Sequence, residues 1–394
     1  MKLRPKLKMS AAISAVSVLL TGCVTAEQAA IYSDREAGFS TVSAQASVAT
    51  RGKQSIWIQN QEQAQENANR VHALIHKKKI SADTAVQIAL LNNKGLQAAY
   101  AELGLSAAEA WQQTMLQNPT VSVGVLGIGA PGLGLFRAIE GMIANNLLSL
   151  ATQKRRVEVA DTRFRQTQMK AVVETLKLAN ETRRAWIVAV SAFETITYLK
   201  QAQVAADAAS ELARKLGETG AIPKAEQARE QAFYAELTGQ LAEARLAAKL
   251  SKEELTRLMG LWGTDVDYLV PDRLPTLPVR LATKDRIEAE ALRERVDLKV
   301  AKLELEAVAQ SYGLTEATRY VTDLELIVGF EAEREIETEY ELHHGNLEET
   351  STKETTITPQ IELEFVIPIF DSGKARMRKA ELSYMQAANR LAEK

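Results

Sequence analysis

Glutamates occupy every second position over part of this chain, and their spacing is the strongest chemical signal in the sequence. The odd positions from Glu331 to Glu341 are all glutamate, whereas the even positions from 324 to 342 are mostly apolar. A period of two is typical of a β-strand, because successive side chains point to opposite faces. One face would carry carboxylates that belong in water, and the other would belong in lipid or against packed protein. Membrane β-barrels alternate in this way, and so would a long solvated hairpin on a soluble protein.

The only cysteine, Cys23, follows a stretch that is typical of a secretion signal. A basic N-terminus precedes an apolar segment from Ala11 to Leu20, which is too short to span a bilayer. Leu20-Thr21-Gly22-Cys23 matches the lipobox of bacterial lipoproteins. We therefore expect residues 1–22 to be a lipoprotein signal peptide and Cys23 to carry covalent lipid, the alternative being an ordinary signal and a free thiol. By resemblance to such lipoproteins, the non-acidic Val24 favours anchoring in the outer membrane of a Gram-negative bacterium.

Other chemistry finds little support in the sequence. A formal net charge of −2 argues against nucleic acid as a partner. Walker, HExxH, CxxC and GxSxG motifs are missing, so we expect no enzyme and no cofactor beyond the lipid on Cys23. His72 and His76 have the i, i+4 spacing of a helical metal site, but no carboxylate or thiol pattern joins them, which favours an exposed surface pair. His343 and His344 would point to opposite strand faces, and we expect no metal site.

The first part of the chain is predicted to be mostly helical. Residues 23–80 are polar and poorly periodic, and we interpret them as an extended N-terminal tether. A helix is expected over residues 81–117, with a possible break at residues 92–93. It leads into a β-hairpin region over residues 119–151, which begins with a strand at residues 121–125 and continues in a segment that fits either strand or helix.

A long antiparallel helical hairpin over residues 152–262 is the largest predicted element. Apolar residues recur there at three-, four- and seven-residue steps, and the return helix, residues 224–259, is rich in alanine. The hairpin turn combines a glycine that can end one helix with a proline that can begin the next. Its candidate docking residues are Gly217, Gly220, Ile222 and Pro223.

The last part of the chain repeats the order of the first. After a proline-containing linker over residues 263–284, we predict a helix at 285–312, the glutamate strand, a polar loop at 344–355, a strand at 360–370 and a helix from Lys374. Ala89, Leu90, Leu96 and Leu103 recur 202 residues later as Ala291, Leu292, Leu298 and Leu305. The sequence therefore predicts a duplicated helix–hairpin–helix unit, with repeats at residues 81–262 and 285–394 and a second β-hairpin at residues 320–370.

Several segments together resemble the TolC-like outer-membrane factor family. The segments that carry the resemblance are Ala89-Leu-Leu-Asn-Asn93 with Leu96, Asn118-Pro119, the turn at 217–223, Leu255-Thr-Arg-Leu-Met-Gly260-Leu261, Arg295-Val-Asp-Leu298 and Pro368-Ile-Phe-Asp-Ser-Gly373. Gly95 and Val296 depart from the family pattern. The specificity lies in the order and spacing of the segments, which span most of residues 81–394.

The resemblance implies a mainly α protein with β-hairpins, in which long antiparallel helical hairpins form a coiled-coil tunnel. Three copies would give four strands each to one twelve-stranded outer-membrane β-barrel. The homotrimer would act as a passive export duct that meets a periplasmic adaptor protein and an inner-membrane pump. By that analogy, the turn at 217–223 docks the adaptor; the alternative is an ordinary surface loop.

Three copies of the glutamate strand would line such a duct with carboxylates. We expect these lumen-facing residues to be Glu325, Glu331, Glu333, Glu335, Glu337, Glu362 and Glu364. Rings of acidic side chains favour cations in channels, so cations, including metal ions, are the expected cargo. Arg334 breaks the apolar face and is expected to mark the boundary of the membrane.

The resemblance also implies a second long helical hairpin after the second β-hairpin, where this sequence has only residues 374–394. We therefore expect a C-terminally truncated member or a fragment. The alternative function is a lipid-anchored coiled-coil structural or adaptor-like envelope protein without a pore, or a non-functional truncated duct.

Overall fold

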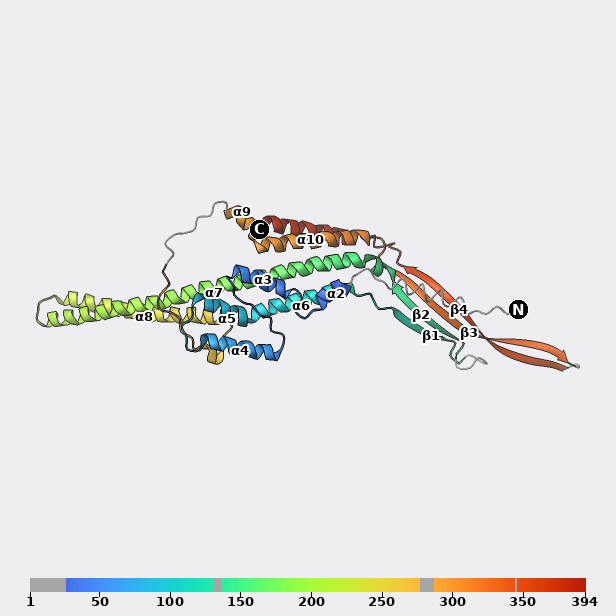
Figure 1. The fold of residues 1–394 in the computed structure, drawn as a ribbon, viewed down its shortest axis with the longest axis horizontal. Helices are drawn as coiled ribbons and strands as arrows, with labels where there is room; N and C mark the ends of the chain where they lie inside the picture. Colours follow the sequence, from blue (N-terminus) through green and yellow to red (C-terminus); the bar gives the residue numbers. More distant parts are fainter. Residues whose placement is uncertain (1–25, 130–135, 277–286, 344–345) are drawn as a thin grey trace. The chain divides into compact units, whose positions relative to one another are not determined.

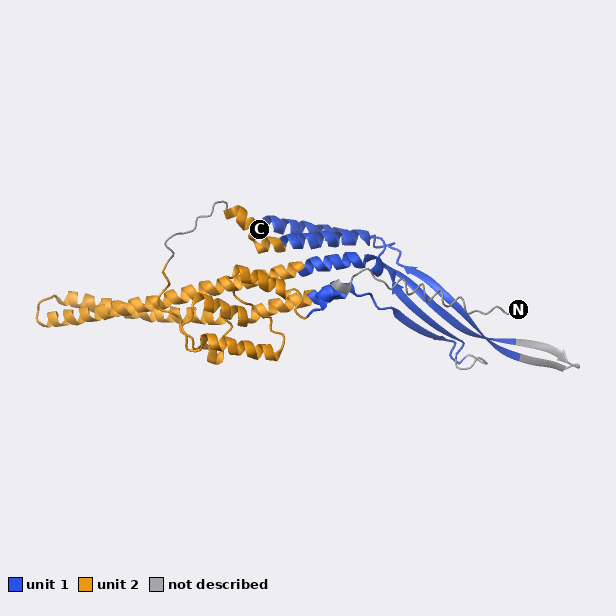
Figure 2. Cartoon of the chain, viewed as in Figure 1, with its two compact units in different colours: residues 1–34, 107–164, 301–394 blue, residues 35–106, 165–300 orange. Residues whose placement is uncertain are grey.

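The computed structural model describes residues 26–129, 136–276, 287–343 and 346–394, and the side chains of these residues except at the tip of the second β-hairpin, residues 338–350. The chain divides into two compact units, coloured separately in Figure 2. Unit 1 contains residues 1–34, 107–164 and 301–394, and unit 2 contains residues 35–106 and 165–300. Each unit contains residues from both sequence repeats, so the boundaries of the compact units do not coincide with the boundaries of the repeats.

The order of elements repeats as the sequence predicted (Figure 1). The first repeat contains α5 (Ala82–Asn92), α6 (Lys94–Thr114), β1 (Thr120–Leu126), β2 (Ala138–Asn146), α7 (Leu147–Glu218) and α8 (Lys224–Leu258). The second repeat contains α9 (Ile287–Glu294), α10 (Val296–Ala317), β3 (Leu324–His343), β4 (Asn346–Phe365) and α11 (Lys374–Glu393). The segment over residues 135–150 fitted either state; within it, Ala138–Asn146 is strand and the helix α7 begins at Leu147.

The break between α5 and α6 at Asn93 has a counterpart that the sequence analysis missed. We expected one helix over residues 285–312, but Arg295 separates α9 from α10. Arg295 lies 202 residues after Asn93, so the internal repeat already carried the signal. At the first break Asn93 Oδ1 accepts a hydrogen bond from Leu96 N at 3.0 Å, whereas at the second Arg295 bonds to Asp297 at 2.6 Å.

The second strand of the second β-hairpin was predicted too short. The polar loop expected at residues 344–355 is strand from Asn346, and β4 ends at Phe365 rather than at residue 370. The segment over residues 346–358 carries five threonines, whose branched side chains suit a strand. Pairing with β3 further stabilises the strand, because every residue of β4 has a partner on β3.

Residues 26–80 are not an extended tether. They contain α2 (Ala26–Ser33), α3 (Phe39–Ala49) and α4 (Gln61–Ile75). Several large apolar residues in this segment, such as Val42 and Ile75, are buried, and Phe39 packs edge-on against Tyr100 of α6 with ring centroids 4.9 Å apart. The apolar residues of these helices are widely spaced and show no clear helical period. Their burial depends on partners such as Tyr100, more than fifty residues away, which a local pattern cannot reveal.

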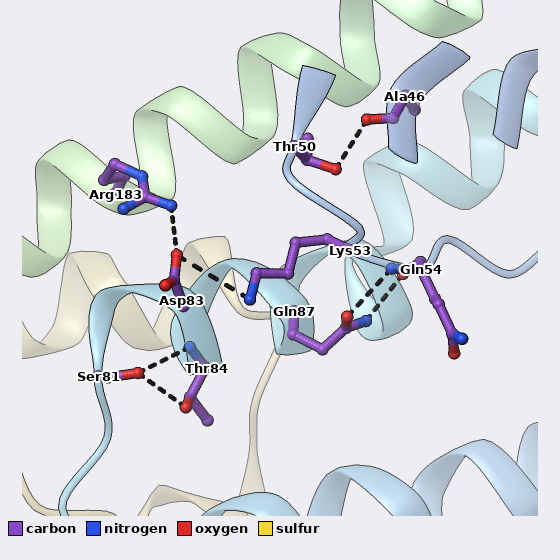
Figure 3. Close-up of polar contacts among 9 residues, drawn as sticks. All are labelled: Ala46, Thr50, Lys53, Gln54, Ser81, Asp83, Thr84, Gln87 and Arg183. Atoms are coloured by element: carbon purple, nitrogen blue, oxygen red, sulfur yellow. Dashed lines mark hydrogen bonds and ion pairs between the residues drawn. The ribbon is translucent and has the colours of Figure 1, made fainter. Parts of the chain in front are cut away.

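Polar contacts also fasten this N-terminal segment to α5 (Figure 3). Gln54 and Gln87 exchange two hydrogen bonds between backbone and side-chain amide, at 3.1 and 2.8 Å. Asp83 accepts a hydrogen bond from Arg183 of α7 at 2.6 Å, and Lys53 lies 4.0 Å from the same carboxylate. The bond from Arg183 is the main reason that the pKa of Asp83 is lowered. Ser81 caps α5, and its Oγ accepts a hydrogen bond from Thr84 N at 3.1 Å.

The core of unit 2 brings together two segments of the family resemblance that are far apart in sequence. Asn92 Nδ2 donates to Gly260 O at 2.7 Å, and Asn93 Nδ2 donates to Leu258 O at 2.9 Å. Gly260 has a φ of +67°, and a Cβ there would lie 2.8 Å from Asn92 O. The two asparagines thus satisfy the last carbonyls of α8, and only glycine allows them this close.

In unit 1, α10 precedes the second hairpin and α11 follows it, and the two helices lie side by side, joined by the ion pair of Arg390 and Glu304 at 3.0 Å. The turn between β4 and α11 uses Asp371 and Gly373: Asp371 Oδ1 accepts from Gly373 N, and Gly373 has a φ of +74°. A Cβ on Gly373 would lie 2.8 Å from Arg319 O, which fixes glycine at this position.

Among the residues that the structure describes, no helix combines the length and the hydrophobicity needed to cross a membrane.

Candidate functional site

An antiparallel sheet in unit 1 carries all seven of the candidate glutamates. Its strand order is β1-β2-β3-β4 (Figure 1). The register pairs Glu325 with Glu364, and Ile327 with Glu362. Residues directly opposite each other in an antiparallel pair lie on the same face. The register therefore determines which side chains share a face across all four strands.

All seven predicted glutamates fall on one face of the sheet. Glu325, Glu331, Glu333, Glu335 and Glu337 share the odd parity of β3, and Glu362 and Glu364 lie opposite odd-numbered residues. From the pair Leu324–Phe365 to the pair Glu337–Thr352, no lysine or arginine of β3 or β4 lies on this face. Facing carboxylates such as Glu325 and Glu364 repel each other, so this face concentrates negative charge.

Two further glutamates belong to this face and were missed by the sequence analysis. Glu140 of β2 lies opposite Glu331, and Glu354 of β4 lies opposite Glu335. Glu140 stands in the segment whose secondary structure was ambiguous, and Glu354 stood in the expected polar loop. Ile139 and Ile143 alternate with residues of the other face, and this pattern could have predicted a strand that places Glu140 on the carboxylate face. Gly141, which lies between the two isoleucines, weakens the pattern.

The other face is apolar and largely exposed. It carries Leu326, Val328 and Phe330 of β3, Ile361 and Leu363 of β4, Ile139 and Ile143 of β2, and Val121, Val123 and Val125 of β1. Val123 is 72% exposed and Ile361 is 77% exposed. A contiguous apolar surface of this kind on a sheet marks contact with lipid or with another protein.

The apolar face ends at a boundary marked by arginine. Arg334 is the first charged residue on this face of β3, and its guanidinium lies 4.7 Å from the ring centroid of Phe136. On the carboxylate face at the same level, Arg137 forms an ion pair with Glu333 at 2.6 Å. Beyond this level, Lys353 lies opposite Ile336 and adds another charge to this face, which is therefore no longer uniformly apolar.

The turn between α7 and α8 in unit 2 contains the other predicted site. Ala221 N donates to Leu216 O at 2.9 Å and Gly220 N donates to Gly217 O at 3.2 Å, the two bonds of a Schellman motif. Gly220 has a φ of +74°, whereas Gly217 is still helical and lets the Gln227 side chain approach. Ile222 is half-buried, and Pro223 is the residue from which α8 begins.

Charges near this turn are neutralised within α7. Arg214 forms ion pairs with Glu211 and Glu218, at 2.7 and 2.5 Å. The hydrogen bond to Glu211 raises the pKa of Arg214, and the same bond lowers the pKa of Glu211. Leu212 on the same helix is 58% exposed. The turn thus presents apolar side chains among paired charges, which suits contact with another protein.

Two predicted features remain, the lipid-attachment cysteine and the pair of histidines at residues 72 and 76. Cys23 and the signal peptide over residues 1–22 lie outside the part of the chain that the structure describes. His72 and His76 lie at the end of α4 as an exposed pair, but each has a carboxylate neighbour that sequence spacing could not reveal.

The fold is that of known outer-membrane channels. The chain superposes on the outer-membrane channel OprN with a TM-score of 0.60 and 18% identity, over 88% of this chain and 75% of that one. A membrane protein from Pseudomonas aeruginosa gives a TM-score of 0.61 at 15% identity, covering 79% and 72% of the two chains. The outer membrane protein VceC from Vibrio cholerae gives 0.56 at 16%, covering 79% and 74%. No protein-family model and no curated protein sequence matches. The expected fold class, long helical hairpins joined to β-hairpins, is confirmed.

Two glycines of the α7–α8 hairpin should respond to alanine in opposite directions. Gly220→Ala forces a left-handed alanine at the turn and should cost about 1 kcal/mol of local stability, which speeds amide exchange near the turn about fivefold. Gly239→Ala, in the middle of α8 with no atom near its Cβ, should slow exchange there, since alanine favours the helix by about 0.5–1 kcal/mol. Hydrogen-exchange mass spectrometry measures both, and a protective effect of Gly220→Ala would contradict this account of the turn.

Proposed function

We propose that this chain is a TolC-like subunit of an outer-membrane channel, which serves as a passive export duct for small solutes in a tripartite efflux system. The observation that carries the proposal is the two-faced sheet, with its glutamates on one side and exposed apolar residues on the other. The fold shared with solved outer-membrane channels supports it. No catalysed step is part of the proposed mechanism.

The size of the apolar face supports a bilayer as its surroundings. On β3 this face runs from Leu324 to Ala332 before Arg334, and on β4 from Ile357 to Phe365. A membrane strand needs about 9–11 residues. At about 3.4 Å per residue and a tilt of about 40°, such a stretch spans roughly 20–25 Å, close to the apolar band of membrane barrels. Contact with a soluble protein would not require the apolar stretch to match the thickness of the apolar band of a membrane barrel.

The sheet also needs copies of itself to be stable in lipid. Within the described residues, the outer edges of β1 and β4 pair with no other strand. Unpaired backbone groups in a bilayer cost several kcal/mol each, so a sheet there must close on itself. Four strands are too few for a barrel, and three copies would contribute twelve. This supports the homotrimer that the family resemblance implies.

The proposed cargo follows from the charge of the inner face. In a closed trimer, the row of glutamates on β3 and β4 would recur three times around the lumen and attract cations by the same effect as acidic rings in channels. We therefore propose that the duct favours cations, including metal ions, over anions.

The remaining parts of the proposal concern partners and anchoring. We propose that the turn over residues 217–223 docks a periplasmic adaptor protein, which in turn meets an inner-membrane pump. We also propose that Cys23 carries the lipid that anchors the chain in the outer membrane, with the helices extending into the periplasm. The exposed apolar side chains near the turn and the lipobox support these two assignments.

Adjacent residues of β3 allow a matched test of membrane insertion. Val328→Lys places a charge on the apolar face and should cost about 2–4 kcal/mol, reducing the heat-modifiable trimer in outer-membrane fractions. Ile327→Lys, one residue away on the carboxylate face and opposite Glu362, should assemble as well as the wild type, because cross-strand charge pairs contribute about 0.2–1 kcal/mol. Equal effects of the two lysines would argue against a lipid-facing sheet. A monomer without bilayer conductance would favour the alternative of an envelope protein without a pore.

Charge removal from the lumen should change ion selectivity. In a KCl gradient across a planar bilayer, the reversal potential of the wild type should report a preference for K⁺ over Cl⁻. The combined variant Glu325→Gln, Glu331→Gln, Glu362→Gln and Glu364→Gln should lose most of that preference. Lys353→Gln on the opposite face is the control and should leave it unchanged. A wild-type channel that favours anions would overturn the cation proposal while leaving the channel proposal intact.

Lipid attachment has a direct test. Metabolic labelling with palmitate should mark the wild type and should be lost in Cys23→Ser, because Cys23 is the only thiol. The mass of the labelled N-terminal peptide should correspond to residues from Cys23 with three acyl chains. Unchanged labelling of Cys23→Ser would refute the assignment of the anchor.

A further inference from the structure

Two histidines and two aspartates meet in unit 2 at a place that the channel proposal does not use. His72 belongs to the last turn of α4 and His76 is its C-terminal cap residue. Asp265 belongs to the short 3-10 helix η2 (Gly263–Val266) that follows α8, and Asp267 comes directly after it. The two pairs are separated by more than 180 residues in sequence, so folding alone brings them together.

The contacts pair each imidazole with one carboxylate. His72 Nδ1 lies 2.8 Å from Asp265 Oδ1, and His76 Nδ1 lies 3.1 Å from Asp267 Oδ2. An ionised carboxylate can only accept hydrogen bonds, so Nδ1 must carry the proton in both rings. In the neutral imidazole this leaves Nε2 with its lone pair, which is the atom that can bind a metal ion.

This arrangement is the one found around histidines that bind metals. A metal-binding histidine usually donates its other ring N–H to a carboxylate, which fixes the ring and makes it a better ligand. The two rings lie on successive turns with centroids 4.7 Å apart, and the side chains are 48% and 47% exposed. Histidines at i and i+4 on one helix face provide two ligands to zinc in known motifs. The rings are therefore oriented, adjacent and accessible.

The surrounding charges also favour a cation. The two aspartates bring two negative charges, and the C-terminus of a helix carries a partial negative charge. Asp267 Oδ1 is buried, and no donor in the described part of the chain satisfies it. The lysines nearby have partners of their own: Lys78 Nζ donates to Ala73 O, Lys79 pairs with Asp272 at 3.5 Å, and Lys252 Nζ donates to the carbonyls on either side of Asp267 at 3.2 and 2.9 Å.

We propose that His72 and His76 bind one divalent transition-metal ion of the Zn²⁺ class through their Nε2 atoms, oriented by Asp265 and Asp267. No group of three or more histidine, cysteine, aspartate or glutamate side chains among the described residues could hold a metal ion together. Water must therefore complete the coordination, and the binding should be reversible. Imidazole nitrogen suits Zn²⁺, Cu²⁺ and Ni²⁺ and discriminates against Ca²⁺ and Mg²⁺. The proposal does not depend on the channel function.

Calorimetric titration of the full-length purified protein with ZnCl₂ tests the site. We expect one ion per chain at this site, with affinity reduced at least 100-fold in the double variant His72→Gln, His76→Gln. The single variant His76→Gln should lose about tenfold or more, since one imidazole cannot chelate. Asp265→Asn with Asp267→Asn should lose about 10- to 100-fold. The matched control, His343→Gln with His344→Gln, removes the other two histidines and should keep the site.

Two measurements on the wild type do not depend on the folding of any variant. Cu²⁺ bound at one equivalent should give an electron paramagnetic resonance spectrum with two coordinated nitrogens. Zn²⁺ should also protect His72 and His76, but not His343 and His344, from diethyl pyrocarbonate, as read by peptide mass spectrometry. Unchanged Zn²⁺ affinity in the double variant, one coordinated nitrogen, or equal modification with and without Zn²⁺ would each overturn the proposal.

Discussion

The antiparallel register between β3 and β4 keeps the seven predicted glutamates and Glu354 on one face, because a shift of one residue would turn every side chain of one strand to the other side. The same constraint extends through β2 to β1, where Glu140 joins the carboxylates and Val121, Val123 and Val125 join the apolar residues. In a sheet with one charged and one apolar face, a one-residue shift of register would mix the two faces and is therefore strongly disfavoured. Its two surroundings, water and an apolar medium, follow from that register.

The parts of the fold that could be predicted from the sequence were those with a strong local period. The alternating glutamates of β3 predict a strand and its two faces, and the glycine and proline around residue 220 predict the turn of the helical hairpin. The missed parts depend on distant partners. Residues 346–355 form a strand because β3 pairs with them, and α3 is held by the contact of Phe39 with Tyr100. A local pattern carries no information about either contact.

The candidate site divides in the same way. The seven predicted glutamates share a face, since parity along a strand can be read directly from the numbering. Glu140 was missed because its strand could not be told from a helix, and Glu354 because its surroundings have no apolar residues. The carboxylates beside His72 and His76 lie 193 and 191 residues away, so sequence spacing could only suggest a pair of histidines. Pairing between remote segments is the information that folding adds.

Facing glutamates make the sheet less stable than it could be, and the size of that cost explains how it is tolerated. A like-charge pair such as Glu325 and Glu364 loses at most about 1 kcal/mol in a sheet. The ladder between the two strands extends from Leu324–Phe365 to His343–Asn346, and each of its hydrogen bonds contributes about 0.5–1.5 kcal/mol. Backbone pairing therefore outweighs the repulsion along the face. Stability does not require these carboxylates, since neutral threonines such as Thr356 and Thr358 already occupy part of the same face. Their concentration is therefore not explained by folding, and it supports the proposed role of this face in attracting cations.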